Sequence, residues 1–317
     1  MPRLIPVKMI PSSLWSKDIL RLPPQLISCW EMLLDKYQLR DKAMTEAPEG
    51  FEGGKSKQDT DNHLAWRFTG SSARVMLTML DPKEDLQQIP DTFARIFSGN
   101  RVFLADLPCG SGAASISILS VFCELRKLGK IPRMPLHIII VGGEISEYAQ
   151  TYARESLSTL INDLEDQAIT IEFDIIDWDV CDKFSNTDLI QQLTLKSQNC
   201  SGKLLMLANF SGFLEREKKW KEAQDQFDEL FRYSRGNNSI ALWIEPQTNN
   251  VTDEGKFFSR LIKWFTKIFS KIIGKDKEIE QLSYACSSVK VKHPLCEGEF
   301  RSHLAVIRFD LPPRSKV

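Results

Sequence analysis

Five short, almost continuously apolar segments are the feature of this sequence that most restricts its fold. They span residues 101–107, 136–144, 168–177, 203–210 and 239–246, with helical patterns between them. A strand that is apolar on both faces must be covered on both faces, and the crossover helices of a parallel sheet provide that cover. The pattern therefore predicts an α/β fold with a mostly parallel sheet and helices on both faces.

The chain before and after this alternation differs in character. Residues 281–292 and 302–311 are β-rich and predict an antiparallel hairpin at the sheet edge, which makes seven strands in all. Residues 1–62 start with several prolines, contain one expected helix over 26–44, and end in the polar stretch EAPEGFEGGKSKQDTDN, which is typical of a mobile loop. We therefore expect an N-terminal helical extension with a mobile loop over 1–62 and an α/β domain over 63–317.

Composition excludes several classes of protein. The 317 residues are 42% hydrophobic and 26% charged, which is enough to bury a sizeable core and excludes a mostly disordered chain. The formal net charge of −1 gives no global positive field towards nucleic acid or an anionic membrane. The apolar runs are shorter than the roughly 20 residues of a membrane-spanning helix, and the proline-interrupted start lacks a signal-peptide pattern. We therefore expect a soluble, cytoplasmic protein without a transmembrane segment.

The 7 cysteines and 4 histidines are dispersed, with no CxxC or CxH spacing among them. Metal sites need clustered donors, and an odd, scattered set of cysteines argues for reduced thiols. The sequence therefore predicts no metal site and no disulfide framework. Each histidine is expected to be an ordinary surface or packed residue.

A glycine-containing turn follows the first apolar strand. It reads Asp106-Leu-Pro-Cys-Gly110-Ser-Gly112 and leads directly into a helix. Glycine allows a sharp turn and a close approach to a ligand, and the first N–H groups of a helix can donate to an anionic group. Ligands of open parallel sheets bind beyond the carboxyl ends of the strands. The turn is therefore a candidate ligand loop, although such a turn can also simply join a strand to a helix.

Acidic side chains also end the next two strands. Glu144 can accept both hydroxyls of a ribose, or it can be a favourable carboxylate at a helix start. Asp177 and Trp178 suit an exocyclic amine and the face of a purine, or they can be an exposed acid beside a core tryptophan. Because the carboxyl ends of parallel strands meet at one edge of the sheet, we expect these residues to lie near the turn at Gly110.

In this order, the segments ADLPCGSG, VGGEISEYAQTYARESL, FDIIDWDV and LLMLANFSGF, with the terminal hairpin, resemble class I S-adenosylmethionine-dependent methyltransferases over residues 65–312. The resemblance implies that 63–317 is a catalytic domain with a Rossmann-like fold and that S-adenosyl-L-methionine is its cofactor. The residues that it places around the cofactor are Phe68, Thr69, Asp106, Pro108, Gly110, Gly112, Glu144, Ile145, Asp177, Trp178 and Asn209.

The resemblance also implies a role for each part of this set. Asp106 and the two glycines shape the pocket for the methionine part, Glu144 holds the ribose, and the adenine lies between Asp177 and Trp178. Phe68 and Thr69 fold over the cofactor, and Asn209 faces the transferable methyl group.

The sequence departs from the family at two places. Pro108 stands at the usual first glycine of the loop, and NFSG stands where base-methylating members carry Asn-Pro-Pro-aromatic, which disfavours direct methylation of a base amino group. A nicotinamide dinucleotide is the rival cofactor, but Ser115 stands where its motif needs glycine or alanine.

Asn209, Ser211 and Glu245 are the candidate catalytic residues, because they follow the fourth and fifth strands. Glu245 is either a general base or an acid that caps the following loop. Residues 256–275 form a basic, amphipathic helix, which either covers the sheet or contacts nucleic acid or an anionic membrane.

We expect nucleic acid as the acceptor, then a protein side chain, then a small molecule, and a possible protein partner at the N-terminal extension. The alternative is a catalytically inactive scaffold or regulatory subunit.

Overall fold

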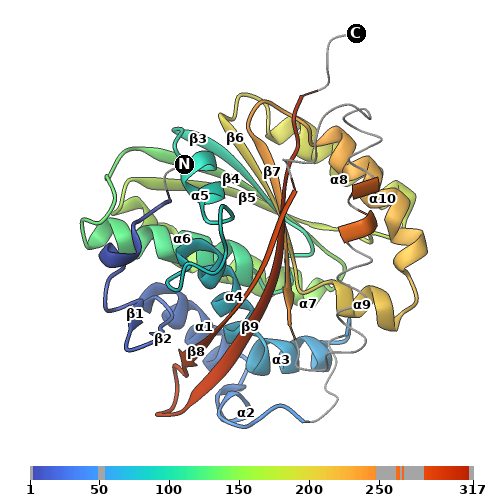
Figure 1. Cartoon of the computed structure of the whole chain (residues 1–317). Helices are drawn as coiled ribbons and strands as arrows, with labels where there is room; N and C mark the ends of the chain where they lie inside the picture. Colours follow the sequence, from blue (N-terminus) through green and yellow to red (C-terminus); the bar gives the residue numbers. More distant parts are fainter. Residues whose placement is uncertain (1–2, 49–53, 248–261, 265, 268–281, 314–317) are drawn as a thin grey trace.

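The computed structural model describes residues 3–48, 54–247, 262–264, 266–267 and 282–313. The strands in this part of the chain are β1 (Trp15–Ser16), β2 (Ile19–Leu20), β3 (Arg101–Asp106), β4 (Leu136–Glu144), β5 (Ile169–Asp177), β6 (Gly202–Ala208), β7 (Ser239–Pro246), β8 (Leu282–Lys292) and β9 (Glu299–Asp310). They form one 9-stranded sheet in the order β1-β2-β8-β9-β7-β6-β3-β4-β5, which is drawn in Figure 1.

The sheet is mostly parallel, as predicted. Strands β3 to β7 all run parallel to their neighbours in this group, and β9 runs antiparallel to both β7 and β8. The expected number of seven strands is wrong, because the N-terminal hairpin β1–β2 joins the sheet beside β8. Lys17 and Asp18 form its turn with φ of 53° and 59°, as two-residue hairpin turns require. Strands of two residues are too short to leave an alternating pattern in a sequence.

The order of the parallel strands reverses next to β3. β4 and β5 follow on one side of β3, whereas β6 and β7 lie on its other side. Asp106, the last residue of β3, is in register with Gly142 of β4 and Met206 of β6. The carboxyl ends of β3 and β6 therefore form a switch point, where open parallel sheets have a ligand crevice.

The helices are α1 (Pro24–Lys36), α2 (Arg40–Ala43), α3 (Lys57–Trp66), α4 (Phe68–Leu80), α5 (Asp91–Ile96), α6 (Ala113–Lys127), α7 (Glu147–Glu165), α8 (Lys183–Lys196), α9 (Ser211–Arg216) and α10 (Trp220–Tyr233). Helices cover both faces of the sheet, as predicted (Figure 1). Val102 and Leu104 of β3 join a core with side chains of α1, α4, α6 and α7. Phe103 and Ala105 join a second core with side chains of α8 and α10. Successive side chains of a strand point to opposite faces, and this alternation shows that β3 is buried on both of them.

The N-terminal segment contributes side chains to the first of these cores, among them Trp30, which is fully buried. The helix expected over 26–44 is divided into α1 and α2, because Gln38 between them has a positive φ of 58°. The expectation of a loop up to residue 62 is wrong for 57–62, which form the start of α3. The hydroxyl of Ser56 accepts a hydrogen bond from the Asp59 N–H and caps this helix. The domain boundary at residue 62 stays a prediction.

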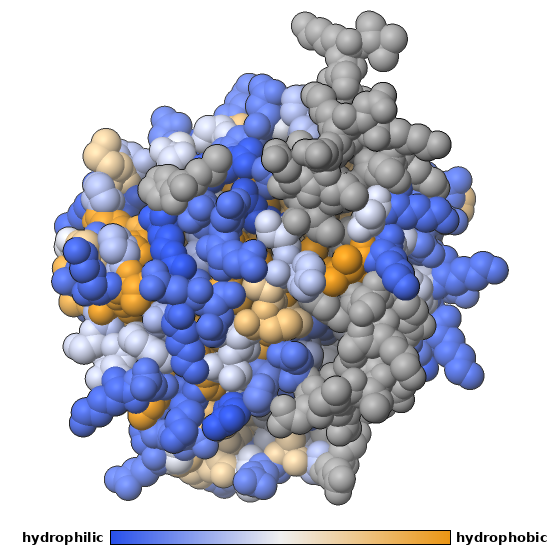
Figure 2. Space-filling view, viewed as in Figure 1, coloured by the Kyte–Doolittle hydropathy of each residue, from blue (hydrophilic) through white to orange (hydrophobic). Residues whose placement is uncertain are grey.

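The surface in Figure 2 is mostly hydrophilic on the face shown, with small, separate hydrophobic patches. Scattered apolar surface of this kind is normal for a globular protein. Among the helices of the described residues, none combines the length and the hydropathy that crossing a membrane requires.

Candidate functional site

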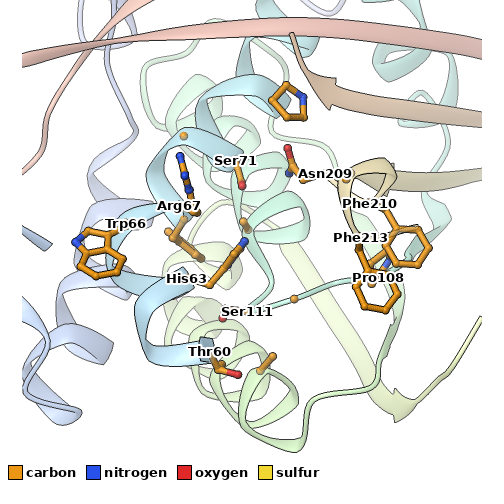
Figure 3. Close-up of a pocket in the computed structure, with 18 of the residues that line it drawn as sticks. Thr60, His63, Trp66, Arg67, Ser71, Pro108, Ser111, Asn209, Phe210 and Phe213 are labelled. Carbon is orange, nitrogen blue, oxygen red and sulfur yellow. The ribbon is translucent and has the colours of Figure 1, made fainter. Parts of the chain in front are cut away.

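A cavity of about 730 Å³ opens at the switch point of the sheet. Its walls come from the turn after β3, the ends of β4 and β6, the segment after β5, and helices α3 and α4. Figure 3 shows His63 and Ser71 on the side of the two helices and Asn209, Phe210 and Phe213 on the opposite side. The volume lies within the roughly 300–1,000 Å³ of small-molecule sites. The cavity is therefore a candidate binding site at the sheet edge where the sequence predicts one.

Asp106 lines this cavity and is only 1% exposed. Its Oδ2 accepts hydrogen bonds from the backbone N–H and the hydroxyl of Ser115, at 3.0 and 2.7 Å. Its Oδ1 is buried and has no hydrogen-bond partner among the described residues. Burial raises the pKa of Asp106 to about 7. A cationic group of a ligand would stabilise the ionised form of this carboxyl, because an unpaired charge is costly to bury.

The glycines of the turn have different surroundings. Gly110 lines the cavity beside Pro108, and a Cβ added to it would meet nothing within 4 Å. Gly112 is not among the lining residues. Its φ is 85°, and an added Cβ would lie 3.1 Å from Ile116 and 3.4 Å from Ala153. The first glycine therefore leaves room for a ligand, whereas the second permits the close packing of α6 against α7.

Glu144 also lines the cavity, together with Ile145. Its Oε2 accepts a hydrogen bond from the Gly110 N–H at 3.0 Å, and its Oε1 accepts one from the Ser146 N–H at 2.9 Å. Burial raises the pKa of Glu144, and these N–H donors oppose the shift. Each carboxylate oxygen has a second lone pair, which leaves acceptors for the hydroxyls of a ligand. Glu144 thus fixes the turn and the start of α7, and it remains a candidate ribose residue.

The end of β5 differs from the sequence prediction. Trp178 lines the cavity and is 2% exposed. Asp177 is exposed and is not among the described residues that line the cavity, whereas Asp179 is. Oδ1 of Asp179 accepts a hydrogen bond from the Cys181 N–H at 2.9 Å. The acid beside the cavity is therefore the second one in DWDV, and the repeated acid around Trp178 is the signal that could have found it.

The segment before β3 reaches the cavity through the start of α4. Phe68 and Thr69 line the cavity and are 1% and 5% exposed. The ring of Phe68 stacks against Trp30 of α1, with 6.5 Å between the centroids. Packing against the N-terminal segment therefore fixes the position of Phe68 beside the cavity.

Of the three acceptor-side candidates, the structure brings only Asn209 to the cavity. Asn209 lines it with a positive φ of 58°, a conformation that Asn adopts more readily than most residues. Ser211 and Glu245 are not among the described lining residues. Glu245 is 4% exposed, and its Oε1 accepts hydrogen bonds from the N–H groups of Phe210 and Ser211 at 3.2 and 2.8 Å. Glu245 thus holds the loop after β6, and burial raises its pKa.

Sequence reasoning missed a group of basic side chains on α3 and α4. His63, Arg67 and Arg74 all line the cavity, and Figure 3 shows the first two on the helix side. Burial, together with the positive charges of the two arginines, lowers the pKa of His63 to about 4. Burial likewise lowers the pKa of Arg74 to about 10. His63 lies in α3, Arg67 between the two helices and Arg74 in α4, so no helical periodicity in the sequence joins them.

Two other sequence predictions concern a metal site and the basic helix over 256–275. The described residues contain no group of three or more His, Cys, Asp or Glu side chains that could hold a metal ion. The predicted basic helix over 256–275 lies largely outside the described residues. Of its described residues, Trp264 is 5% exposed and its ring lies 6.0 Å from that of Phe227 and 6.4 Å from that of Trp243.

Comparison with protein-family models gives no match, and comparison with curated proteins gives none either. A protein from a study of the conversion of a disulfide bond into a thioacetal group during echinomycin biosynthesis is 12% identical, with a TM-score of 0.37 over 72% of this chain and 83% of its own. A Listeria monocytogenes protein, provisionally described as a class I S-adenosylmethionine-dependent methyltransferase, is 13% identical, with a TM-score of 0.34 over 92% and 90% of the two chains.

The glycopeptide N-methyltransferase MtfA, complexed with sinefungin, is 9% identical to this chain, with a TM-score of 0.27 over 72% and 87% of the two chains. Likenesses at these scores carry no argument about function. The function must therefore be argued from the topology and the site of this chain itself.

Proposed function

We propose that this chain is an S-adenosylmethionine-dependent methyltransferase and that the cavity at the switch point binds the methyl donor. The observation that supports this most strongly is the convergence of Asp106, Gly110, Glu144 and Trp178 on one cavity. The sequence resemblance assigns these residues to a single cofactor, although they come from three different strand ends. The antiparallel strand β9 beside β7 also agrees with the fold that the resemblance implies.

The residues present fit the chemical groups of the donor. Its amino group is a cation, and Asp106 Oδ1 is a buried oxygen without a partner among the described residues. Its ribose has two hydroxyls, and Glu144 keeps lone pairs free beside Gly110. Its adenine has an aromatic face and an exocyclic amine, for which we assign Trp178 and Asp179.

The contacts of Ser115 argue against a nicotinamide dinucleotide. The backbone N–H and the hydroxyl of Ser115 both bind Asp106, and the residue is 2% exposed. The N–H group of Ser115 at the start of α6 therefore already donates to a carboxylate of the chain itself. A pyrophosphate would need these N–H groups and a close approach at this point.

When bound, the donor supplies a methyl group that is activated by its positively charged sulfur. The chain then has to hold an acceptor in line with that methyl group and to exclude water. We assign Asn209 to the acceptor, because it directly follows β6 at the cavity and its backbone conformation is unusual for a residue other than glycine.

Nucleic acid as acceptor and a protein partner at the N-terminal extension stay predictions, because the basic residues of 256–275 lie largely outside the described part of the chain. A scaffold subunit without turnover is the second candidate function. The position of Glu245 favours it, because the expected general base binds backbone N–H groups and does not line the cavity.

Calorimetric titration with S-adenosylmethionine tests the proposal. We expect the wild-type protein to bind and Glu144→Gln to bind about 10-fold more weakly, the loss of one hydrogen bond to a charged group. Glu147→Gln is the matched control, because Glu147 is an exposed acid in the first turn of α7. Labelled methyl transfer into cell extract gives the second readout. Binding with transfer supports the enzyme, binding without transfer supports the scaffold, and no binding by the folded wild type overturns both.

A further inference from the structure

The side-chain amide of Asn209 is oriented by an arginine from α4. Nε of Arg74 lies 2.8 Å from Oδ1 of Asn209. A guanidinium has only donors, and the amide atom that faces it must therefore be the carbonyl oxygen. The NH₂ group of Asn209 has no hydrogen-bond partner among the described residues, and Asn209 lines the cavity. The NH₂ group of Asn209 thus offers donors to a molecule in the cavity.

Arg74 adds further donors to the same wall. Its Nη2 lies 3.3 Å from the hydroxyl of Ser71, and the guanidinium makes no ion pair within the described part of the chain. Burial lowers its pKa, and the charge of Glu245 opposes that shift only in part. The positive charge of Arg67 acts on Arg74 in the same direction as burial. Because a partly buried cation is costly without a counter-charge, this wall favours a negatively charged ligand group.

Among the described residues, four acids line the cavity, and the proposed function assigns three of them to the donor. Asp106, Glu144 and Asp179 each accept a hydrogen bond from a backbone N–H, and Glu46 is exposed. His63 and His293 both line the cavity, and burial lowers the pKa of each, that of His63 to about 4, which makes it a weak base. Because we assign Asp106, Glu144 and Asp179 to the donor, and burial lowers the pKa of both histidines, an acceptor that needs no base fits the described lining residues best.

We infer that the methyl acceptor is a carboxylate, held by the guanidinium of Arg74 and the amide NH₂ of Asn209. The inference rests on the proposed methyl transfer. A carboxylate is already ionised at neutral pH and needs no base, and its two oxygens match the planar donors of a guanidinium. In the reaction, a lone pair of one carboxylate oxygen forms the new O–CH₃ bond. The bond from the methyl carbon to sulfur breaks, and its electron pair goes to sulfur. No proton moves, and the products are a methyl ester and a neutral thioether.

This chemistry changes the expected order of acceptors. The unmodified nucleotides of nucleic acids offer amines, hydroxyls and phosphodiesters, but no carboxylates. A carboxyl group of a protein or of a small acid is the acceptor that fits the donors of Arg74 and Asn209.

The stability of the product to alkali tests the inference. Wild-type protein is incubated with methyl-labelled S-adenosylmethionine and cell extract, the protein and small-molecule fractions are separated, and each is treated with mild alkali. We expect the label to be released as volatile methanol, as from an ester, and the fraction that releases it identifies the source of the carboxylate. Label that resists alkali overturns the inference and leaves the methyltransferase proposal intact. Absence of both binding and label overturns both, and binding without label overturns the carboxylate acceptor in favour of the scaffold.

A variant of Asn209 tests the role of its amide NH₂ group. Asn209→Asp keeps an oxygen that accepts the hydrogen bond from Arg74 but removes the NH₂ donors. Its negative charge also offsets the positive charge of Arg74. We expect it to lose about 10- to 100-fold of the ester-forming rate while the donor affinity is unchanged. An amine acceptor predicts the opposite, because a carboxylate oxygen could accept its N–H, and retained transfer in Asn209→Asp would overturn the inference.

Anion binding gives a readout that does not depend on turnover. The melting temperature is measured with benzoate, with neutral benzamide and with inorganic phosphate, for wild type, Arg74→Met and the control Arg133→Met, which removes an exposed arginine. We expect benzoate to stabilise the wild type and Arg133→Met, and this stabilisation to be lost in Arg74→Met. Equal effects of benzoate and benzamide, stabilisation by phosphate alone, or an unchanged benzoate effect in Arg74→Met would each contradict the carboxylate site.

Discussion

The two halves of the cavity differ in the charge of the side chains that line them. In the half that we propose binds the methyl donor (the donor half), formed by the turn after β3 and the ends of β4 and β5, Asp106 and Glu144 end their strands and line the cavity. In the acceptor half, formed by the end of β6 and by α3 and α4, the predicted acid Glu245 binds backbone N–H groups instead. Arg74 of α4, and Arg67 between α3 and α4, line the cavity there. A strand end thus predicts where a residue lies along the sheet edge, but not which way its side chain points.

The largest effect that we expect in the donor half is from Asp106→Asn. Loss of the charge that we assign to the donor's amino group should weaken S-adenosylmethionine binding by about 100-fold in calorimetric titration. The binding should also depend on pH in the wild type. Because the pKa of Asp106 is raised to about 7, lowering the pH below 7 protonates it and weakens binding, whereas higher pH ionises it. Asp106→Asn should lack this pH dependence of binding. An equal pH dependence in the variant would contradict the assignment of Asp106 to the donor's amino group.

A smaller loss is expected at the end of β5, where the two acids of DWDV differ in exposure. Asp179→Ala should weaken donor binding by about 10-fold, the cost of one hydrogen bond from the adenine amine. Asp177→Ala is the matched control and should bind as the wild type does, because Asp177 is exposed and does not line the cavity. The reverse result would restore the assignment that the sequence suggested.

Stability against pH reports on the helix side of the acceptor half. The folded-state pKa of His63 is about 4, below its usual value of 6.5, because of burial and of Arg67 and Arg74. Its contribution to the free energy of unfolding is complete above pH 6.5 and is lost as the pH falls towards 4, since the unfolded chain then binds the proton more strongly. His63→Gln should reduce this loss by on the order of 1–3 kcal/mol. Denaturant titrations at pH 7 and 4.5 measure it, and equal losses in both proteins would contradict the buried, neutral imidazole.

The smallest effect is expected from Glu245→Gln. A glutamine oxygen can still accept the N–H groups of Phe210 and Ser211, and methyl transfer should therefore fall only about 3-fold, roughly half the cost of a hydrogen bond. A general base would give a loss of about 100-fold or more and a changed pH profile. Single-turnover rates measured across pH distinguish a general base from a residue that only holds the loop. The larger loss would show that Glu245 acts on the acceptor, as the acids of the donor half are proposed to act on the donor.

Much of the fold could be predicted from the sequence because its signals are local. Apolar runs of strand length with helices between them gave the parallel strands, and the turn-forming HPLCEGEF gave the hairpin β8–β9. The hairpin β1–β2 could not be predicted, because its two-residue strands are fixed by pairing with β8, far away in the chain. The division of the helix over 26–44 depends on one residue, Gln38, whose positive φ leaves no periodic signal.

The sequence by itself determined where the parallel strands lie along the chain and that a glycine turn follows the first of them, because strand length, apolar pattern and glycine are local features. The exact ends differ, since β3 ends at Asp106 and β6 at Ala208 rather than at 107 and 210. Only the tertiary structure decided that Asp179 and not Asp177 lies at the cavity, that Glu245 points into the fold, and that Arg74 meets Asn209. These outcomes depend on single backbone angles and on the packing of α3 and α4 over the sheet edge. A side chain's direction is set by such distant contacts, which no local pattern contains.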